Sequence, residues 1–189
     1  MKNVFSLATL VAVLATLASA APSKIDRRLP GGPVVATVGA EFFTVVDQDV
    51  NSPSVGTQTG VVQRINGNQE KHTFVSFDLT KVAHTAASTC NLIIRNVDSV
   101  SGSGHAQLFT IGGPITATTP LSFYSHPYYD LYAGEYIVNP NGDSNAVDVV
   151  SIPCRFDAKS QYVLRPQNDN DYIKFTQGTN SGVFIEVRN

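Results

Sequence analysis

The residues best suited to contact a ligand are tyrosines in the aromatic stretch Leu121–Tyr136, namely Tyr124, Tyr128, Tyr129 and Tyr132. A tyrosine side chain has a flat apolar face and a polar hydroxyl, which suits stacking on a sugar ring or packing against a partner protein. The same rings could instead cover one end of the folded domain, and the lack of tryptophan weakens the interpretation as a sugar site. Ligand binding at these four tyrosines is the functional hypothesis, and packing is its alternative.

Residues that could support catalysis occur, but not in a recognisable arrangement. The run Gly102–His105 differs from the Gly-x-Ser-x-Gly nucleophile elbow because position 101 is serine, so the run is typical of a flexible turn. A glycosidase requires two carboxyl groups that face each other across a cleft, and the sequence does not pair its carboxylates. The available carboxylates include Glu41, Asp78, Asp98, Asp130, Glu135 and Glu186. We therefore predict no catalytic residue and no enzymatic activity.

Acidic loops and cysteines are the places where a metal ion could bind. Asp47–Asn51 places oxygen atoms at alternate positions as calcium loops do, but it lacks the glycine and the glutamate that complete such a loop. Asn141–Asp143 and Asn168–Asp171 have a similar composition and are typical of solvated turns. Two cysteines with no histidine at ligand spacing do not complete a zinc shell. We predict neither a metal site nor a cofactor.

The beginning of the chain has the features of an export signal. Lys2 precedes the apolar run Val4–Leu17, and Ala18–Ala20 matches the small-residue pattern before a signal-peptidase cleavage site. The apolar run is shorter than the roughly 20 residues of a membrane span. A signal peptide at 1–20 is therefore predicted, with a membrane anchor as the alternative.

A dibasic pair, Arg27-Arg28, follows the signal and predicts a propeptide at 21–28, with an uncleaved flexible terminus as the alternative. The first 28 residues contain four of the 13 basic and one of the 15 acidic side chains, so the remaining chain has a net charge of −5. This balance argues against binding to nucleic acid and against docking on anionic lipid. With no second long apolar run, we predict no membrane segment after removal of the signal.

Cys90 and Cys154 are the two cysteines of the chain. In an exported protein an even pair predicts a disulfide, which here would close a loop of 63 intervening residues. A loop of that size contributes roughly 4 kcal/mol on the chain-entropy argument. The alternative is two free thiols buried as small hydrophobic side chains. Around Cys90 the stretch Ser88–Asn96 alternates, which predicts a strand with Cys90, Leu92 and Ile94 on one face.

From residue 29 onward the pattern is one of short β-strands separated by turns, without a run of helical length and period. The expected strands are Val34–Val38, Glu41–Val46, Val61–Ile65, Thr73–Leu79, Ser88–Asn96, Ala106–Ile111, Glu135–Val138, Ala146–Ile152, Tyr162–Arg165, Tyr172–Phe175 and Val183–Val187. The pattern predicts an all-β domain, a jelly-roll-like β-sandwich with one disulfide. Its N-terminal strands and loop occupy 29–60, and its main part occupies 61–189.

Several segments of the chain resemble a family of fungal secreted domains named the ubiquitin-binding But-type C-terminal domain. These segments are Phe77–Leu79, Thr89–Ile94, Ser151–Cys154, Asp169–Phe175 and Gly182–Ile185. The resemblance covers Val61–Val187 and implies that 61–189 is a But-type β-sandwich domain bridged by Cys90 and Cys154, with no catalytic residue. The aromatic stretch Leu121–Tyr136 departs from the family pattern.

The sequence and the resemblance together predict a secreted fungal protein, extracellular or in the cell wall. We expect it to bind a cell-wall polysaccharide or a host surface without catalysis. A purely structural component of wall or matrix is the first alternative, and an enzyme that acts on polysaccharide is the second.

Overall fold

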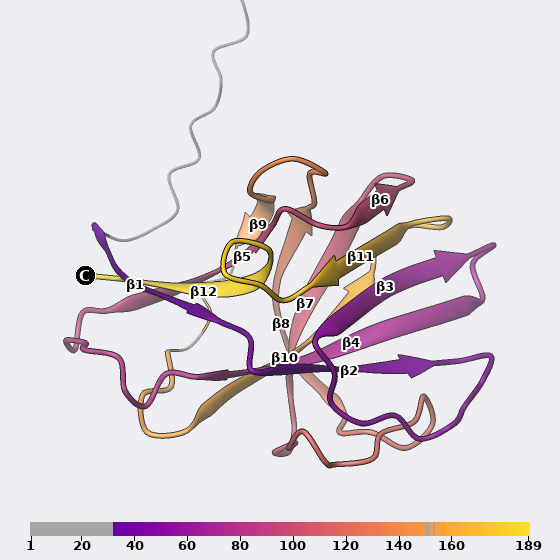
Figure 1. Cartoon of the computed structure of the whole chain (residues 1–189), viewed down its shortest axis with the longest axis horizontal. Coiled ribbons are helices and arrows are strands. Elements are labelled where there is room, and N and C mark those ends of the chain that lie inside the picture. The colour runs from indigo at the N-terminus through magenta and orange to yellow at the C-terminus, as the bar shows by residue number, and fades with distance from the viewer. Residues whose placement is uncertain (1–31, 150–151, 153) are drawn as a thin grey trace, which may run out of the picture.

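The structure, a computed structural model, describes residues 32–149, 152 and 154–189, and the predicted signal peptide and propeptide lie outside them. Antiparallel β-strands make up the regular structure of the described residues (Figure 1). The strands are β1 (Val34–Gly39), β2 (Phe42–Asp47), β3 (Thr59–Ile65), β4 (Gln69–Asp78), β5 (Thr89–Arg95), β6 (Ser99–Ser101), β7 (His105–Ile111), β8 (Tyr129–Ile137), β9 (Asn145–Val149), β10 (Lys159–Pro166), β11 (Tyr172–Thr176) and β12 (Gly182–Arg188). The all-β prediction is confirmed.

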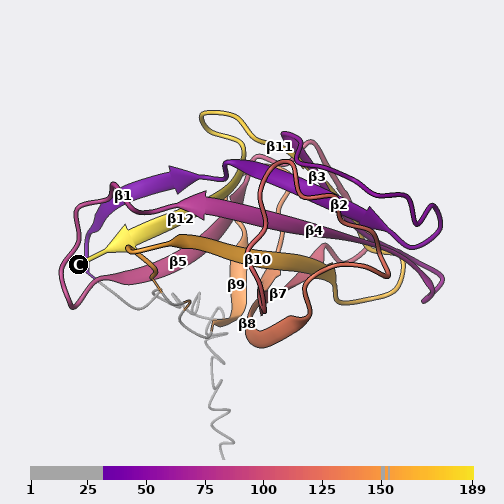
Figure 2. The same cartoon turned by 90° about the horizontal axis from the view of Figure 1, so that it is seen from below.

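Two sheets pack against each other around the main core. The small sheet has the order β1-β12-β5, and the large sheet has the order β6-β11-β3-β4-β10-β7-β8-β9, with β2 also paired to β4. Figure 2 shows the small sheet at one end of an elongated molecule and β2 and β3 reaching toward the other end. Cys90, Leu92 and Ile94 of β5 pack in this core with Val75 and Phe77 of β4, so the predicted face of β5 is the buried one.

The strand with the most partners is β4, which pairs with three other strands. It pairs with β2 along Lys71–Ser76, while its other edge pairs first with β3 and then with β10. The change of partner occurs at Thr73, whose hydroxyl accepts a hydrogen bond from Val61 N at 2.9 Å and donates one to Val61 O at 2.7 Å. This side chain bridges the place where β3 leaves the edge of β4.

The predicted disulfide joins Cys90 and Cys154, whose Cα atoms are 5.4 Å apart. Cys90 is fully buried and pairs through its backbone with Ile152, so the bridge fastens β5 to the segment that follows β9. A disulfide of this kind stabilises the fold mainly by restricting the unfolded chain.

One strand, β6, is not among those expected from the sequence. Ser99–Ser101 form β6, paired with Tyr172–Lys174 of β11. Serine and glycine carry no strong strand signal, and here the strand forms because β11 offers a free edge and Val100 packs against the core. Among the residues described, no helix has the length and apolar character that a membrane-spanning segment requires.

Candidate ligand-binding face

The segment 112–128, between β7 and β8, crosses the outer face of the large sheet. Ile115 and Leu121 are buried there against Phe74 of β4 and other residues of a second apolar cluster. Successive side chains of a strand point to opposite faces, so Phe74 faces this cluster while its neighbour Val75 faces the main core. Part of the aromatic stretch therefore covers the sheet, as the packing alternative expected.

Tyr128 is the exposed tyrosine whose ring the backbone holds in place. The residue is 65% exposed, and its carbonyl oxygen accepts a hydrogen bond from Gly112 N at 3.0 Å. A Cβ atom at position 112 would lie only 2.0 Å from Cζ of the Tyr128 ring. The ring therefore rests against the bare backbone of Gly112 and leaves most of its surface to solvent.

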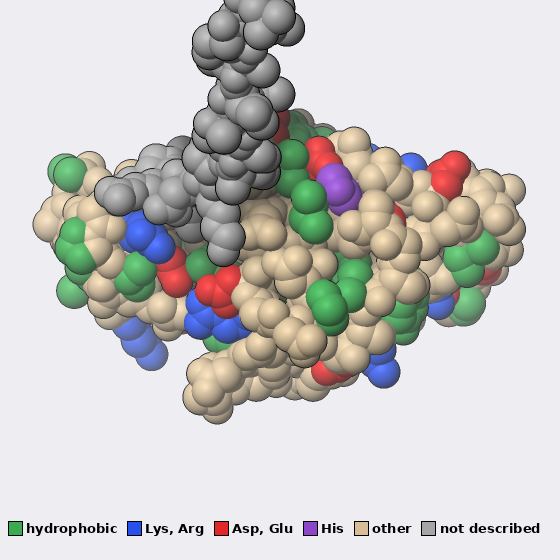
Figure 3. All heavy atoms as spheres, turned by 90° about the horizontal axis from the view of Figure 1, so that it is seen from above, with side chains coloured by type: hydrophobic (Ala, Val, Ile, Leu, Met, Phe, Trp, Pro, Cys, Tyr) green, Lys and Arg blue, Asp and Glu red, His purple; other side chains and the backbone are tan. Residues whose placement is uncertain are grey.

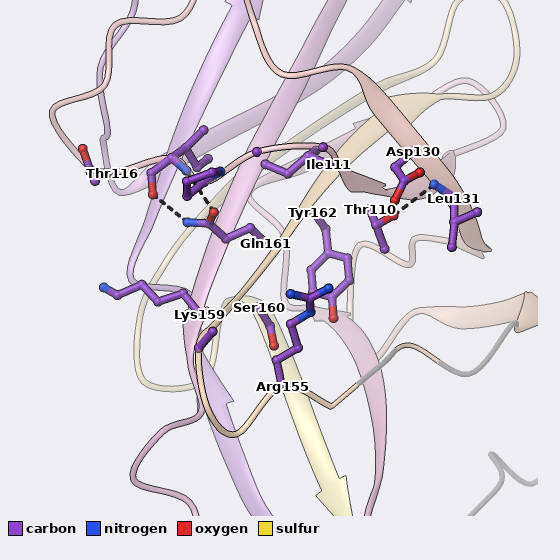
Figure 4. A pocket seen from close by; sticks show the side chains of 15 residues that line it. Thr110, Ile111, Thr116, Asp130, Leu131, Arg155, Lys159, Ser160, Gln161 and Tyr162 are labelled. Carbon is purple, nitrogen blue, oxygen red and sulfur yellow. Dashed lines mark hydrogen bonds between the residues drawn. The ribbon is translucent and has the colours of Figure 1, made fainter.

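An open pocket of about 630 Å³ lies beside this ring, and Gly112 belongs to its wall. Figure 4 shows Asp130 and Leu131 at one end of the pocket and Lys159 at the other. Leu131, a residue of the pocket wall, is 64% exposed and adds apolar surface to the pocket. The pocket and the Tyr128 ring together are called the ledge site below.

The ledge site has one rigid polar wall. The side-chain amide of Gln161 accepts a hydrogen bond from Ile115 N at 2.9 Å and donates one to Ile115 O at 2.6 Å (Figure 4). The same amide donates to Ser76 Oγ at 3.1 Å, so it is fully engaged. The ammonium group of Lys159 is paired with both carboxylate oxygens of Glu41, at 2.7 and 2.8 Å. Neither side chain is free to bind a ligand without losing these contacts.

Asp130 and Arg155 are the exposed charged side chains that remain in the ledge site. Asp130 accepts a long hydrogen bond of 3.4 Å from Thr110 Oγ1 and otherwise faces solvent. Arg155 reaches toward Tyr162 in Figure 4, where its charge opposes the burial that raises the pKa of the Tyr162 hydroxyl to about 12. The ledge site thus offers a ligand a carboxylate acceptor and guanidinium donors beside apolar surface.

The other predicted tyrosines occupy different environments. Tyr124 is 70% exposed and contacts only Phe123 among the described ring pairs, with the two ring centroids 5.4 Å apart. Tyr132 is half-buried against Phe109 at 5.6 Å, and burial raises the pKa of its hydroxyl. Tyr129 points toward the sheet, away from the ledge. None of the four predicted rings lines the pocket itself, but the Tyr128 ring contacts Gly112 of its wall.

Tyr129 ends in a buried polar cluster on the outer face of β4. Its hydroxyl lies 2.5 Å from Nδ1 of His72, and Nε2 of His72 lies 2.5 Å from Glu70 Oε2. Arg64 binds the other oxygen of Glu70 through Nε and Nη2, at 2.8 and 2.7 Å. The guanidinium of Arg165 covers the Tyr129 ring, with Cζ 4.8 Å from the ring centroid.

The protonation states in this cluster follow from its geometry. The hydrogen bond from His72, with the nearby Arg64 guanidinium, lowers the pKa of Glu70 to about 2, so Glu70 is an ionised acceptor. His72 is 2% exposed, and burial lowers its pKa, so it is neutral near pH 7. Nε2 of His72 therefore carries the hydrogen, and Nδ1 accepts one from Tyr129. Burial raises the pKa of Tyr129 to about 12, which keeps its hydroxyl a donor.

The acidic loops that resembled calcium sites are held by hydrogen bonds within the protein. The buried carboxylate of Asp171 accepts from Ser103 N at 2.5 Å, Gly104 N at 3.1 Å and Ser103 Oγ at 2.8 Å. Asp47 pairs with Lys71 at 2.7 Å. Within the described part of the chain, no group of three histidine, cysteine or acidic side chains could hold a metal ion. Ser103 is likewise a structural donor rather than a free nucleophile.

Sequence reasoning missed the cluster around His72. A signal was present, because Glu70 and His72 are two positions apart on a strand and must share a face. Their partners Arg64, Tyr129 and Arg165 come from three other strands, however, and only the pairing of β4 with β3 and β10 brings two of them alongside.

The surface charge is dispersed on the face that Figure 3 shows, where acidic and basic side chains lie among each other. No family model matches the chain, and a search of curated proteins finds no significant match, so the resemblance to the But-type domain stays a prediction.

Proposed function

We propose that this protein is a secreted, non-catalytic binding protein of a fungal surface or cell wall, and that its ledge site holds a polysaccharide. The observation that carries this proposal is the exposed Tyr128 ring, which rests on Gly112, a residue of the wall of an open pocket. A single-domain β-sandwich with a disulfide suits an oxidising extracellular setting.

The chemistry of the ledge site matches that of a sugar ring. The apolar CH face of a sugar stacks on an aromatic ring, and its hydroxyls require both acceptors and donors. Tyr128 and Leu131 supply the apolar surface, Asp130 supplies acceptors and Arg155 supplies donors. An open pocket also allows a long chain to pass through it, which a closed cavity would prevent.

The arrangement of carboxylates favours binding over hydrolysis. Glycosidases of the usual kind require two carboxyl groups on opposite sides of the scissile bond. Asp130 is the one acidic side chain among the described residues that line the pocket. This supports a binding role and argues against the polysaccharide-active enzyme that the sequence left open.

The test is co-sedimentation of the processed protein with insoluble β-glucan, chitin and mannan. We expect Tyr128→Ala to weaken binding roughly ten-fold, the factor that corresponds to about 1.4 kcal/mol from a lost stacking contact. Tyr124→Ala is the matched control, because Tyr124 is similarly exposed but its ring packs against Phe123, which is not part of the pocket wall. Equal binding by the wild type and Tyr128→Ala overturns the proposal. Absence of binding to all three polymers favours a purely structural role, and release of soluble sugar favours an enzyme.

A further inference from the structure

The chain contains two Asn-Gly pairs, Asn66-Gly67 and Asn141-Gly142, and both asparagines are exposed. An asparagine followed by glycine can deamidate without an enzyme. The backbone nitrogen of the glycine attacks the side-chain Cγ, a C–N bond forms, and the side-chain nitrogen leaves as ammonia with the proton of the glycine nitrogen. Water then opens the resulting succinimide to aspartate or to isoaspartate, in which the backbone runs through the former side chain.

The backbone conformation of Asn66 opposes this reaction. Ring closure requires the nitrogen of the next residue to turn onto the same side of the Cα–C bond as Cβ. Asn66 has a φ of +50°, in the left-handed region, where ψ is about +47°. At that ψ the Gly67 nitrogen lies nearly anti to Cβ of Asn66, so the two reacting atoms are held apart. Exposure of Asn66 to solvent is therefore not enough to make it reactive.

The turn that contains Asn66 joins β3 to β4 and is held by hydrogen bonds. Asn68 N donates to Ile65 O at 3.2 Å and closes the turn. Asn66 N donates to the side-chain oxygen of Asn170 at 3.3 Å. To bring the Gly67 nitrogen toward its own side chain, Asn66 must leave the left-handed region, and this movement disrupts the turn.

Asn141 lies in the loop between β8 and β9 and does not have a positive φ. The space around the next residue is open, because a Cβ at Gly142 would meet no atom within 4 Å. Rotation of the peptide group between Asn141 and Gly142 therefore meets little obstruction. The two Asn-Gly pairs are alike in sequence and in exposure, but their backbones differ in access to the reactive geometry.

The loop that carries Asn141 covers the edge of β5 that β12 leaves free. Ser144 N donates to Ile94 O at 2.7 Å, which ties the loop to the strand. Just beyond the end of β5, Asn96 N donates to Gly142 O at 3.2 Å. Isoaspartate at 141 adds one carbon to the backbone directly before Gly142. We expect this longer backbone to displace the loop from both of its hydrogen-bonding partners.

We infer that Asn141 is a site of spontaneous deamidation in the folded protein, that its left-handed backbone protects Asn66, and that isoaspartate at 141 detaches the loop from β5. The inference is independent of the proposed function, because it involves the chain and water alone. In the folded protein Asn66 should react roughly ten-fold more slowly than Asn141. That factor corresponds to a barrier higher by about 1.4 kcal/mol, the size of one hydrogen bond of the turn.

The experiment incubates the folded protein at pH 8 and measures deamidation at each position by mass spectrometry of its peptides, with isoaspartyl methyltransferase as the label for isoaspartate. We expect conversion at Asn141 and about a tenth as much at Asn66. The control is the same incubation in urea, where the turn is lost and the two pairs should react at similar rates. Equal rates in the folded protein overturn the inference, as does an unreactive Asn141. A ten-fold difference that persists in urea also overturns it, because the flanking sequence would then be the cause.

Hydrogen exchange tests the detachment of the loop. The amides of Asn96 and Ser144 should exchange faster in protein that carries isoaspartate at 141 than in fresh protein. Asn141→Gln is the matched variant, because glutamine closes the corresponding six-membered ring much more slowly, and the incubated variant should keep the exchange rates of fresh protein. Unchanged exchange after conversion of Asn141 overturns the detachment. Equally fast exchange in the incubated Asn141→Gln variant overturns it as well, because a change elsewhere would then be responsible.

Discussion

The ring of Tyr128 lies so close to Gly112 that no other residue could occupy position 112 without moving it, since a Cβ there would be 2.0 Å from Cζ of the ring. Because of this contact, the position of the Tyr128 ring can be changed without replacing the tyrosine itself. A substitution of Gly112 displaces the Tyr128 ring but removes none of the side chains of the ledge site.

We expect Gly112→Ala to weaken polysaccharide binding about as much as Tyr128→Ala does, because the new Cβ displaces the Tyr128 ring from the pocket wall. The free energy of unfolding should change by less than about 1 kcal/mol, since the ring is mostly exposed and can swing into solvent. Co-sedimentation and urea unfolding measure the two effects. Gly113→Ala is the matched control, because a Cβ there meets nothing within 4 Å. Unchanged binding in Gly112→Ala would contradict the role of the ring.

Acid should reduce the stability of the fold in two ranges of pH. His72 has a lowered pKa in the folded protein, so its contribution is full above its ordinary pKa of 6.5 and is lost as the pH falls. Glu70 has its pKa lowered from 4.5 to about 2, so its contribution is full above 4.5 and is lost between there and about 2.

Glu70→Gln tests the lower range. At pH 7 we expect the variant to be less stable than the wild type by on the order of 2 kcal/mol, and we expect this difference to shrink toward pH 2, where the wild-type carboxylate begins to be protonated in the folded protein. Urea unfolding at several pH values measures it. A difference that stays constant with pH would show that the lost stability is not electrostatic.

Removal of the disulfide should destabilise the fold without changing its architecture. For the double variant Cys90→Ala with Cys154→Ala we expect a loss of about 4 kcal/mol, because the bridge closes a long loop of the unfolded chain. Urea unfolding gives the loss, and far-UV circular dichroism reports whether the strands remain. A loss under about 1 kcal/mol would mean that the core alone holds β5 in place.

Loss of the buried carboxylate of Asp171 should lower the stability of the fold more than loss of the exposed carboxylate of Asp169. Asp171→Asn replaces one acceptor oxygen by an NH₂ group that faces the donors of Ser103 and Gly104, and we expect a loss of about 2 kcal/mol. Hydrogen exchange at the Ser103 and Gly104 amides should become faster. Asp169→Asn is the control, because Asp169 is exposed and lies 4.0 Å from its nearest cationic partner, Arg64. Equal effects in the two variants would contradict the structural role of Asp171.

Side-chain spacing along the sequence predicts most of the strands and the buried face of β5, but not β6. Alternation placed Cys90, Leu92 and Ile94 on one side of β5, and they are in the main core. The two cysteines were enough to predict their disulfide, because there was one possible pairing. The strand faces depend on the spacing of side chains within a few residues, and two cysteines allow only one pairing. Both features can therefore be derived without knowing how distant segments meet.

The contacts between distant strands determine which tyrosine is exposed to solvent and which points into the sheet. Tyr128 and Tyr129 are adjacent and chemically identical in the sequence, yet one rests on Gly112 and the other donates to His72. The difference arises from β4, β7 and β10, which lie far from these residues along the chain and meet them through strand pairing. Side chains assembled in this way leave no local periodicity, because their spacing is set by the order of strands in the sheet.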